Sequence, residues 1–167
     1  MADAGGAGGH EGYPSGFVGP LPQNGYYRNE MIRSRCGNIP PGPPPLGPQA
    51  FETRMEEASS HISPFWFRNQ VKNGAAWDFK QEDPKWEDYG NLNYGATGTE
   101  AGFPFPPAIL KRQAGAAQVS AGNSNPGWGK AGWLAFPWTW KAPYGDQPRD
   151  QYWIQRGIEM ANCLTAN

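Results

Sequence analysis

The chain has few of the residues that metal centres and histidine-dependent enzymes require. Its 167 residues include two cysteines and two histidines. Cys36 and Cys163 lie far apart, with no CxxC spacing and no clustered histidine, which argues against a zinc site and leaves open whether they form a long-range disulfide. His10 lies in a Gly-rich stretch and His61 at the edge of an expected helix. We therefore expect neither a metal nor a cofactor, and a mechanism that needs a histidine base has only His61 to use.

Long apolar runs and long runs of like charge are also missing. No apolar stretch reaches about 18 residues, and no charged segment followed by an apolar core begins the chain, so we expect neither a membrane-spanning helix nor an ordinary export signal. From Arg68 onward ten Lys or Arg face nine Asp or Glu, with no like-charge run longer than two. The charge pattern typical of a phosphate-backbone binder is absent.

Glycine and proline are abundant, with 23 and 18 copies, and they are unevenly distributed. Residues 1–49 hold "DAGGAGGHEG" and "PPGPPPLGP" and no tryptophan, whereas all eight tryptophans lie between Trp66 and Trp153. We interpret residues 1–49 as a flexible or polyproline-II leader or linker, and residues 50–167 as the folded, catalytic domain. Limited proteolysis is then expected to trim the chain to about Gln49 without loss of activity.

The folded part shows helical patterns and no alternating strand of useful length. Residues 51–62 carry apolar side chains at 4-3-4 spacing, as in one stripe of an amphipathic helix. Three further segments begin and end with residues typical of helix termini: 63–74, 106–122 and 146–163. Ser63 and Asp146 occupy the expected capping positions of the first and last of these segments.

Two long loop regions separate these helices. Residues 75–105 are expected to be rich in loops, with a short helix from Trp86, and residues 123–145 to form an irregular aromatic loop with "WLAFPWTW" as a short hairpin arm. Loops of this length inside a compact domain are usually binding or catalytic surfaces. The predicted fold is a small, mainly α domain with long Gly/Pro/Trp-rich loops.

The stretch "WEDYGNLNYGATGTEAGFPF", residues 86–105, concentrates polar side chains among glycines. Hydrolysis of a glycosidic bond needs two carboxyl groups about 5 to 9.5 Å apart. Asp88 can supply one, with Glu87, Glu100 or Asp146 as its partner, and desolvation by Trp86 would raise the pKa of a neighbouring carboxyl. The alternative is that these acids cap helices and bond local backbone.

Three more side chains of this stretch are candidate substrate ligands: Asn91, Asn93 and Tyr94. Their amide and phenol groups can hold sugar hydroxyls or orient a water, and glycines 90, 95 and 98 would let a substrate approach the backbone. Alternatively, the three side chains brace the loop.

Four segments together resemble a known family: "FRNQVKNGAAWDFKQ", "EDYGNLNYGATGTEAGFP", "LKRQAGAAQ" and "YGDQPRDQYWIQRGIE". Residues 64–160 resemble the polymorphic toxin type 44 family, which are C-terminal toxin domains of bacterial conflict systems. The resemblance implies an enzyme aimed at rival bacteria, a delivery module and a cognate immunity protein. The polar positions that match are Asp78, Lys80, Asp88, Asn91, Asn93, Tyr94, Arg112, Asp146 and Asp150.

Asp146 and Asp150 are four residues apart, so they share one face if both are helical. They are either catalytic carboxylates or a helix cap and a first-turn acid. Lys80, Arg112 and Arg149 either bind an anion or are ordinary surface charges.

These observations favour a secreted antibacterial hydrolase that acts on the glycan strand of peptidoglycan in the periplasm of the target cell. The loop from Trp128 to Trp140 suits stacking on a sugar ring, although it would also suit a nucleobase. The alternative is a ribonuclease-type toxin that uses Lys80, Arg112 and His61 on RNA in the target cytoplasm. A third hypothesis is a non-enzymatic, aromatic-rich binding module with a Pro-rich leader.

Overall fold

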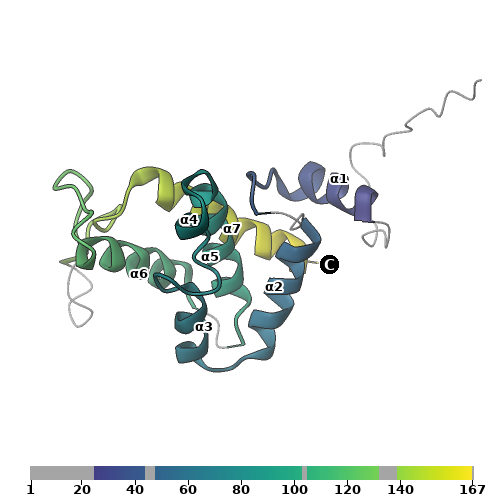
Figure 1. Ribbon diagram of the computed structural model, residues 1–167, viewed down its shortest axis with the longest axis horizontal. Coiled ribbons are helices and arrows are strands. Elements are labelled where there is room, and N and C mark those ends of the chain that lie inside the picture. The colour runs from purple at the N-terminus through teal and green to yellow at the C-terminus, as the bar shows by residue number, and fades with distance from the viewer. Residues whose placement is uncertain (1–24, 44–47, 103–104, 132–138, 167) are drawn as a thin grey trace, which may run out of the picture.

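The computed structural model describes residues 25–43, 48–102, 105–131 and 139–166 (Figure 1). Its helices are α1 (Gly25–Cys36), α2 (Pro48–Ser60), α3 (Pro64–Val71), α4 (Phe79–Glu82), the 3-10 helix η1 (Pro84–Trp86), α5 (Glu87–Glu100), α6 (Pro107–Ser120) and α7 (Pro148–Thr165). Within the described ranges no strand forms, and Lys130 and Lys141 make an isolated antiparallel bridge. The prediction of a mainly α fold is confirmed.

The centre of the molecule is the helix pair α5 and α7. The first turns of the two helices lie side by side, as the ion pair between Arg149 of α7 and Asp88 of α5 shows. They cross at Gly95 and Gly157, where a Cβ on either glycine would overlap a backbone carbonyl oxygen of the other helix. The glycines therefore allow a backbone-to-backbone approach that any side chain would prevent.

This close approach gives a stability prediction with a matched control on the same helix. Gly95→Ala should lower the free energy of unfolding by about 3 kcal/mol, because the added methyl meets the backbone of Ile154 rather than a movable side chain. Gly90→Ala should leave it unchanged or raise it by up to about 1 kcal/mol, since a Cβ there makes only an ordinary contact with Phe79. Urea unfolding of both variants measures the difference. Equal midpoints would show that α5 and α7 can separate at little cost.

A helix begins beside Trp86 as expected, but the expectation that it is short and that loops fill most of residues 75–105 is wrong. A 14-residue helix, α5, occupies Glu87–Glu100, and Leu92 and Ala96 on it are fully buried. Glycine-rich sequence disfavours an isolated helix, but the same glycines let this one pack against α7. Gly98 likewise packs under Leu110 and Phe67, so it is not open to a substrate.

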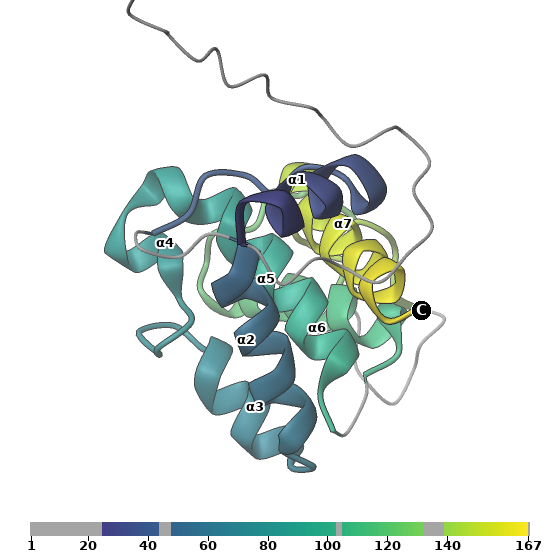
Figure 2. The same ribbon diagram turned by 90° about the vertical axis from the view of Figure 1, so that its right-hand side faces the viewer.

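The leader also differs from expectation. Residues 1–49 were expected to lack helix, which is wrong, because α1 occupies Gly25–Cys36. This helix also packs on the domain, since Ile32 is fully buried and Met31 nearly so. Figures 1 and 2 both place α1 beside the end of α7, and a disulfide joins Cys36 to Cys163 there, with the two Cα atoms 5.7 Å apart. Residues 1–24 and 44–47 lie outside the described part of the chain.

The other helices lie close to their predicted ranges. Residues 51–62 belong largely to α2, which packs on α5 and whose Phe51 and Ala58 are fully buried. Ser63 caps α3 as expected, accepting a hydrogen bond from Trp66 N at 3.4 Å. The segments 106–122 and 146–163 become α6 and α7. No helix in the described ranges is long and apolar enough to cross a membrane.

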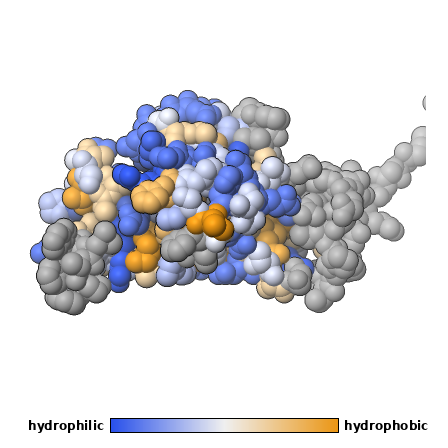
Figure 3. Space-filling view, turned by 90° about the horizontal axis from the view of Figure 1, so that it is seen from below, coloured by the Kyte–Doolittle hydropathy of each residue, from blue (hydrophilic) through white to orange (hydrophobic). Residues whose placement is uncertain are grey.

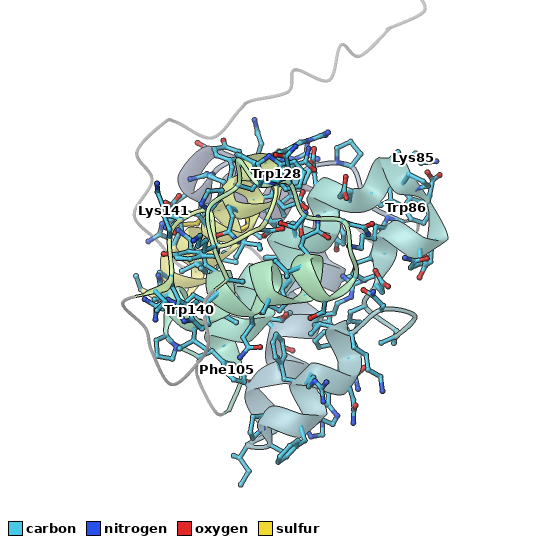
Figure 4. The ribbon with its side chains drawn as sticks, turned by 90° about the vertical axis from the view of Figure 1, so that its left-hand side faces the viewer. Lys85, Trp86, Phe105, Trp128, Trp140 and Lys141 are labelled. Atoms are coloured by element: carbon cyan, nitrogen blue, oxygen red, sulfur yellow. A yellow bond between two sulfur atoms is a disulfide. The ribbon has the colours of Figure 1, made fainter. Side chains whose placement is uncertain are left out.

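The aromatic region from Trp128 to Trp140 is described only in part, because residues 132–138, and with them the core of the expected hairpin arm, lie outside the described ranges. Trp128 and Trp140 are both half-buried. Figure 4 shows Trp86 and Lys85 on the opposite side of the molecule from Trp140 and Lys141. Trp86 and Trp140 therefore do not belong to one continuous aromatic surface.

Candidate functional site

A pocket of about 720 Å³ opens between helices that are distant in the sequence. Residues of α3, α4, α5 and α6 and of the turn into α7 line it. From α5 come Glu87, Gly90, Asn91 and Tyr94, which share one face of that helix. The pocket therefore lies against the same helix that packs on α7, and the polar stretch of residues 86–105 supplies one of its walls.

Four carboxyl groups line this pocket, Asp78, Glu87, Asp146 and Asp150, and the charges of the last three act on one another. Glu87 lies in the first turn of α5 and Asp150 in the first turn of α7, so the side-by-side start of these helices brings both to one end of the pocket. The first turns of helices favour nearby negative charge through their exposed N–H groups. Two helices thus support one acidic cluster.

Asp150 is the most perturbed acid of the cluster. Asp150 is 4% exposed, and its Oδ1 atom is buried with no hydrogen-bond partner among the described residues. Burial, followed by the negative charges of Asp146 and Glu87, raises the pKa of Asp150 to about 7. A carboxyl group with that pKa can hold a proton near neutral pH and release it, as a general acid does.

Asp146 is equally buried, at 2% exposed, but its surroundings differ from those of Asp150. Its Oδ2 accepts a hydrogen bond from Gln151 Nε2 at 2.6 Å, and its Oδ1 accepts one from Gln147 N at 3.0 Å. Burial raises the pKa of Asp146, and these two hydrogen bonds oppose the rise. The expectation that Asp146 caps the last helix is wrong, since Gln147 is the N-cap residue and Pro148 the first helical residue.

Asp88 does not line the pocket. It pairs with Arg149, with 2.7 Å between Asp88 Oδ2 and Arg149 Nη2, and the Arg149 side chain is 60% exposed. The charge of Asp88 still contributes to the raised pKa of Asp150. Glu100 ends α5 twelve residues later, about 18 Å along the helix. Glu100 is therefore too distant from Asp88 to form the expected acid and base pair.

The three candidate ligands from α5 separate in space. Asn91 lines the pocket, and its Nδ2 is buried and has no hydrogen-bond partner in the part of the chain that the structure describes. Tyr94 also lines the pocket, but its hydroxyl donates to the carbonyl of Leu110 at 3.1 Å, and burial raises its pKa. Asn93 is fully buried and lies outside the pocket lining, so the prediction that it contacts substrate is wrong.

Of the other matched residues, only Asp78 and Lys80 line the pocket. Asp78 braces its own loop, accepting from Gly74 N at 2.7 Å. Lys80 is half-buried, and its positive charge lowers the pKa values of Asp146 and Asp150. Arg112 lies outside the lining, with its guanidinium 4.9 Å from the ring centre of Trp140.

Trp86 lies outside the pocket lining and packs against the hydrophobic core, with Lys85 over its ring. It therefore does not desolvate the acids of the pocket, and burial by the surrounding protein raises the pKa of Asp150 instead. His61 stacks on Trp66 with ring centres 3.8 Å apart and does not line the pocket. His10 lies outside the described residues.

No family model, no curated protein and no solved structure matches this chain. The resemblance to the type 44 toxins therefore stays an expectation from sequence. No group of three or more His, Cys, Asp or Glu in the described ranges is arranged to hold a metal ion.

Sequence reasoning missed Gln151 and Phe65. Gln151 is nearly buried and links α7 to α6 and to Asp146. Phe65 lines the pocket while 74% of it is exposed. An exposed aromatic residue at a capped helix start was a usable signal, whereas the sequence pattern at Gln151 is that of an ordinary helical surface.

Proposed function

We propose that the protein is an antibacterial toxin that hydrolyses glycosidic bonds, with Asp150 as the general acid. The observation that carries this proposal is a buried carboxyl group with a pKa of about 7, which lines a pocket together with the carboxyl groups of Glu87 and Asp146. Glycoside hydrolysis needs such a pair, one group protonated and one ionised. The proton on Asp150 would pass to the leaving glycosidic oxygen.

Glu87 is the second carboxylate of this mechanism. It lines the pocket, is half-buried and lies in the first turn of α5. In this role it would activate a water or attack the sugar carbon, according to its separation from Asp150 in the complex. Asp146, held by two donors, would stay ionised and keep the proton on Asp150.

The lining of the pocket supports a glycan as the substrate. Six side-chain amides face it: Asn73, Gln81, Asn91, Gln113, Gln118 and Asn123. Amides donate to and accept from sugar hydroxyls and acetamido groups. The exposed ring of Phe65 offers a flat face to a sugar. Seen from below, the described surface is mostly hydrophilic, with separate hydrophobic spots (Figure 3).

Peptidoglycan is the glycan that fits a toxin delivered to the periplasm. The disulfide between Cys36 and Cys163 supports an oxidising compartment, because such bonds persist outside the reducing cytoplasm. The resemblance to bacterial toxin domains adds a delivery module and an immunity protein as expected partners.

RNA cleavage stays the second candidate because three cationic residues, Arg68, Lys72 and Lys80, also line the pocket. Phosphate oxygens would suit them. However, neither His61 nor Arg112, on which that mechanism was expected to depend, lines the pocket. A binding module without activity would not require a raised pKa at Asp150.

Incubation with purified sacculi tests the proposal directly. We expect release of soluble muropeptides between pH 4 and 8, with a decline above about pH 7 as Asp150 loses its proton. Total RNA incubated in parallel should remain intact. Release of no muropeptide at any pH in this range, or degradation of the RNA instead, would contradict the glycan assignment.

A further inference from the structure

We propose that Gln151 is a positioning residue, which holds the Asp146 carboxylate ionised so that the proton of the buried pair resides on Asp150. The inference rests on the proposed role of Asp150 as the acid and deepens it. Gln151 contacts Asp146 rather than the pocket, so it acts through its neighbour.

The geometry of Gln151 fixes the direction in which its amide points. The side chain is 9% exposed, and its Nε2 donates both to Asp146 Oδ2 at 2.6 Å and to the backbone carbonyl of Lys111 at 2.9 Å. A backbone carbonyl only accepts, so the contact with Lys111 places the NH₂ group, not the amide oxygen, at this position. The second hydrogen of that group is then directed at Asp146.

Asp146 and Asp150 therefore experience opposite surroundings. Both hydrogen-bond partners of Asp146 within the described ranges are donors, which stabilise a carboxylate. Asp150 Oδ1 has no partner there. Two neighbouring buried carboxyl groups cannot both ionise without a large cost. The donors on Asp146 decide which of the two keeps the proton.

The other charged and titratable groups around the pair come from three helices, α4, α5 and α7. Lys80 of α4 opposes the rise in pKa of both acids, whereas Glu87 of α5 increases it. Asp88 of α5 acts on Asp150 while paired with Arg149 of α7, and the Tyr94 hydroxyl of α5 also faces Asp146. None of these groups changes when Gln151 is replaced, so a shift in titration isolates the amide.

The test replaces the amide and follows both carboxyl groups by carbon-detected NMR titration of the full chain. In Gln151→Met the pKa of Asp146 should rise and that of Asp150 should fall by about one unit, because the proton moves to Asp146. The falling high-pH limb of sacculus digestion should move by the same amount to lower pH. Gln155→Met is the matched control: Gln155 lies one turn further along α7 and bonds Glu159, so neither pKa should move.

A double-mutant cycle of Gln151 and Asp146 distinguishes an effect through Asp146 from a purely structural role of Gln151. Asp146→Asn should also lower the pKa of Asp150, and adding Gln151→Met to it should cause no further shift if the amide acts through Asp146. An unmoved Asp150 in folded Gln151→Met would overturn the inference. If that variant does not fold, titration of the wild-type protein decides, since a lower pKa for Asp150 than for Asp146 would equally overturn it.

The two proposals fail in distinguishable ways. The expected titration shifts without any muropeptide release would remove the hydrolase and leave the role of Gln151 intact. Hydrolysis that depends on Asp150 but shows no shift in Gln151→Met would remove the role of Gln151 alone.

Discussion

Asp150→Asn is expected to lower the rate of muropeptide release by about 10²- to 10⁴-fold, the usual contribution of a general acid. The amide has nearly the shape of the protonated acid but cannot pass a proton to the leaving oxygen. Initial rates on purified sacculi across pH 4 to 8 measure the effect. A variant that keeps more than a tenth of the wild-type rate would place the chemistry elsewhere.

Asp88→Asn is the matched control for this change, since it makes the same replacement in the neighbouring helix. Asp88 lies outside the pocket lining and pairs with an exposed arginine, so water and salt weaken this contact. We expect it to retain most of the activity. An inactive Asp88→Asn beside an active Asp150→Asn would reverse the assignment and restore Asp88 as the principal acid.

The stability of Asp150→Asn gives a second test of the raised pKa of Asp150. The pKa of Asp150 rises from 3.8 to about 7 on folding, so the folded state binds this proton more tightly than the unfolded state. The resulting stability is fully present below about pH 3.8 and is lost as pH rises through about 7. The amide of Asp150→Asn does not ionise, so the variant does not lose this stability at high pH. The variant should therefore unfold at higher urea than wild type at pH 8, with the difference shrinking toward pH 4.

Removal of α1 is expected to have the largest effect on folding. A chain that begins at Gln49 loses the buried side chains of Met31 and Ile32 and the bond from Cys36 to Cys163. A disulfide across 127 residues alone stabilises by about 2 to 5 kcal/mol. We expect this chain to be unfolded or to lose at least about 3 kcal/mol, as measured by urea unfolding and circular dichroism.

A chain that begins at Gly25 is the comparison for this deletion, because it keeps α1 and the disulfide. The difference between the two unfolding midpoints then measures what residues 25–48 contribute. Cys36→Ser in the full chain separates the disulfide from the apolar contacts and should show an intermediate loss. An unchanged midpoint for the chain that begins at Gln49 would restore the original interpretation of residues 1–49 as a detachable leader.

The sequence alone determined the helical class and most helix positions. Apolar spacing in residues 51–62 and the cap at Ser63 are local signals, and the structure follows them in α2 and α3. The acids that line the pocket were also named from sequence, because carboxylates near glycines and helix starts are few in this chain. Local pattern was sufficient wherever neighbouring residues decide the conformation.

Only the tertiary structure decided which acids meet. Asp146 and Asp150 were readable as a cap and a first-turn acid, and nothing local shows that α5 and α7 begin side by side or that burial raises the pKa of Asp150. The glycines of α5 predicted loop, since glycine disfavours an isolated helix. Contact with the backbone of α7 reverses that preference at Gly95. Burial, pKa and close helix approach depend on residues distant in the chain, so no local pattern encodes them.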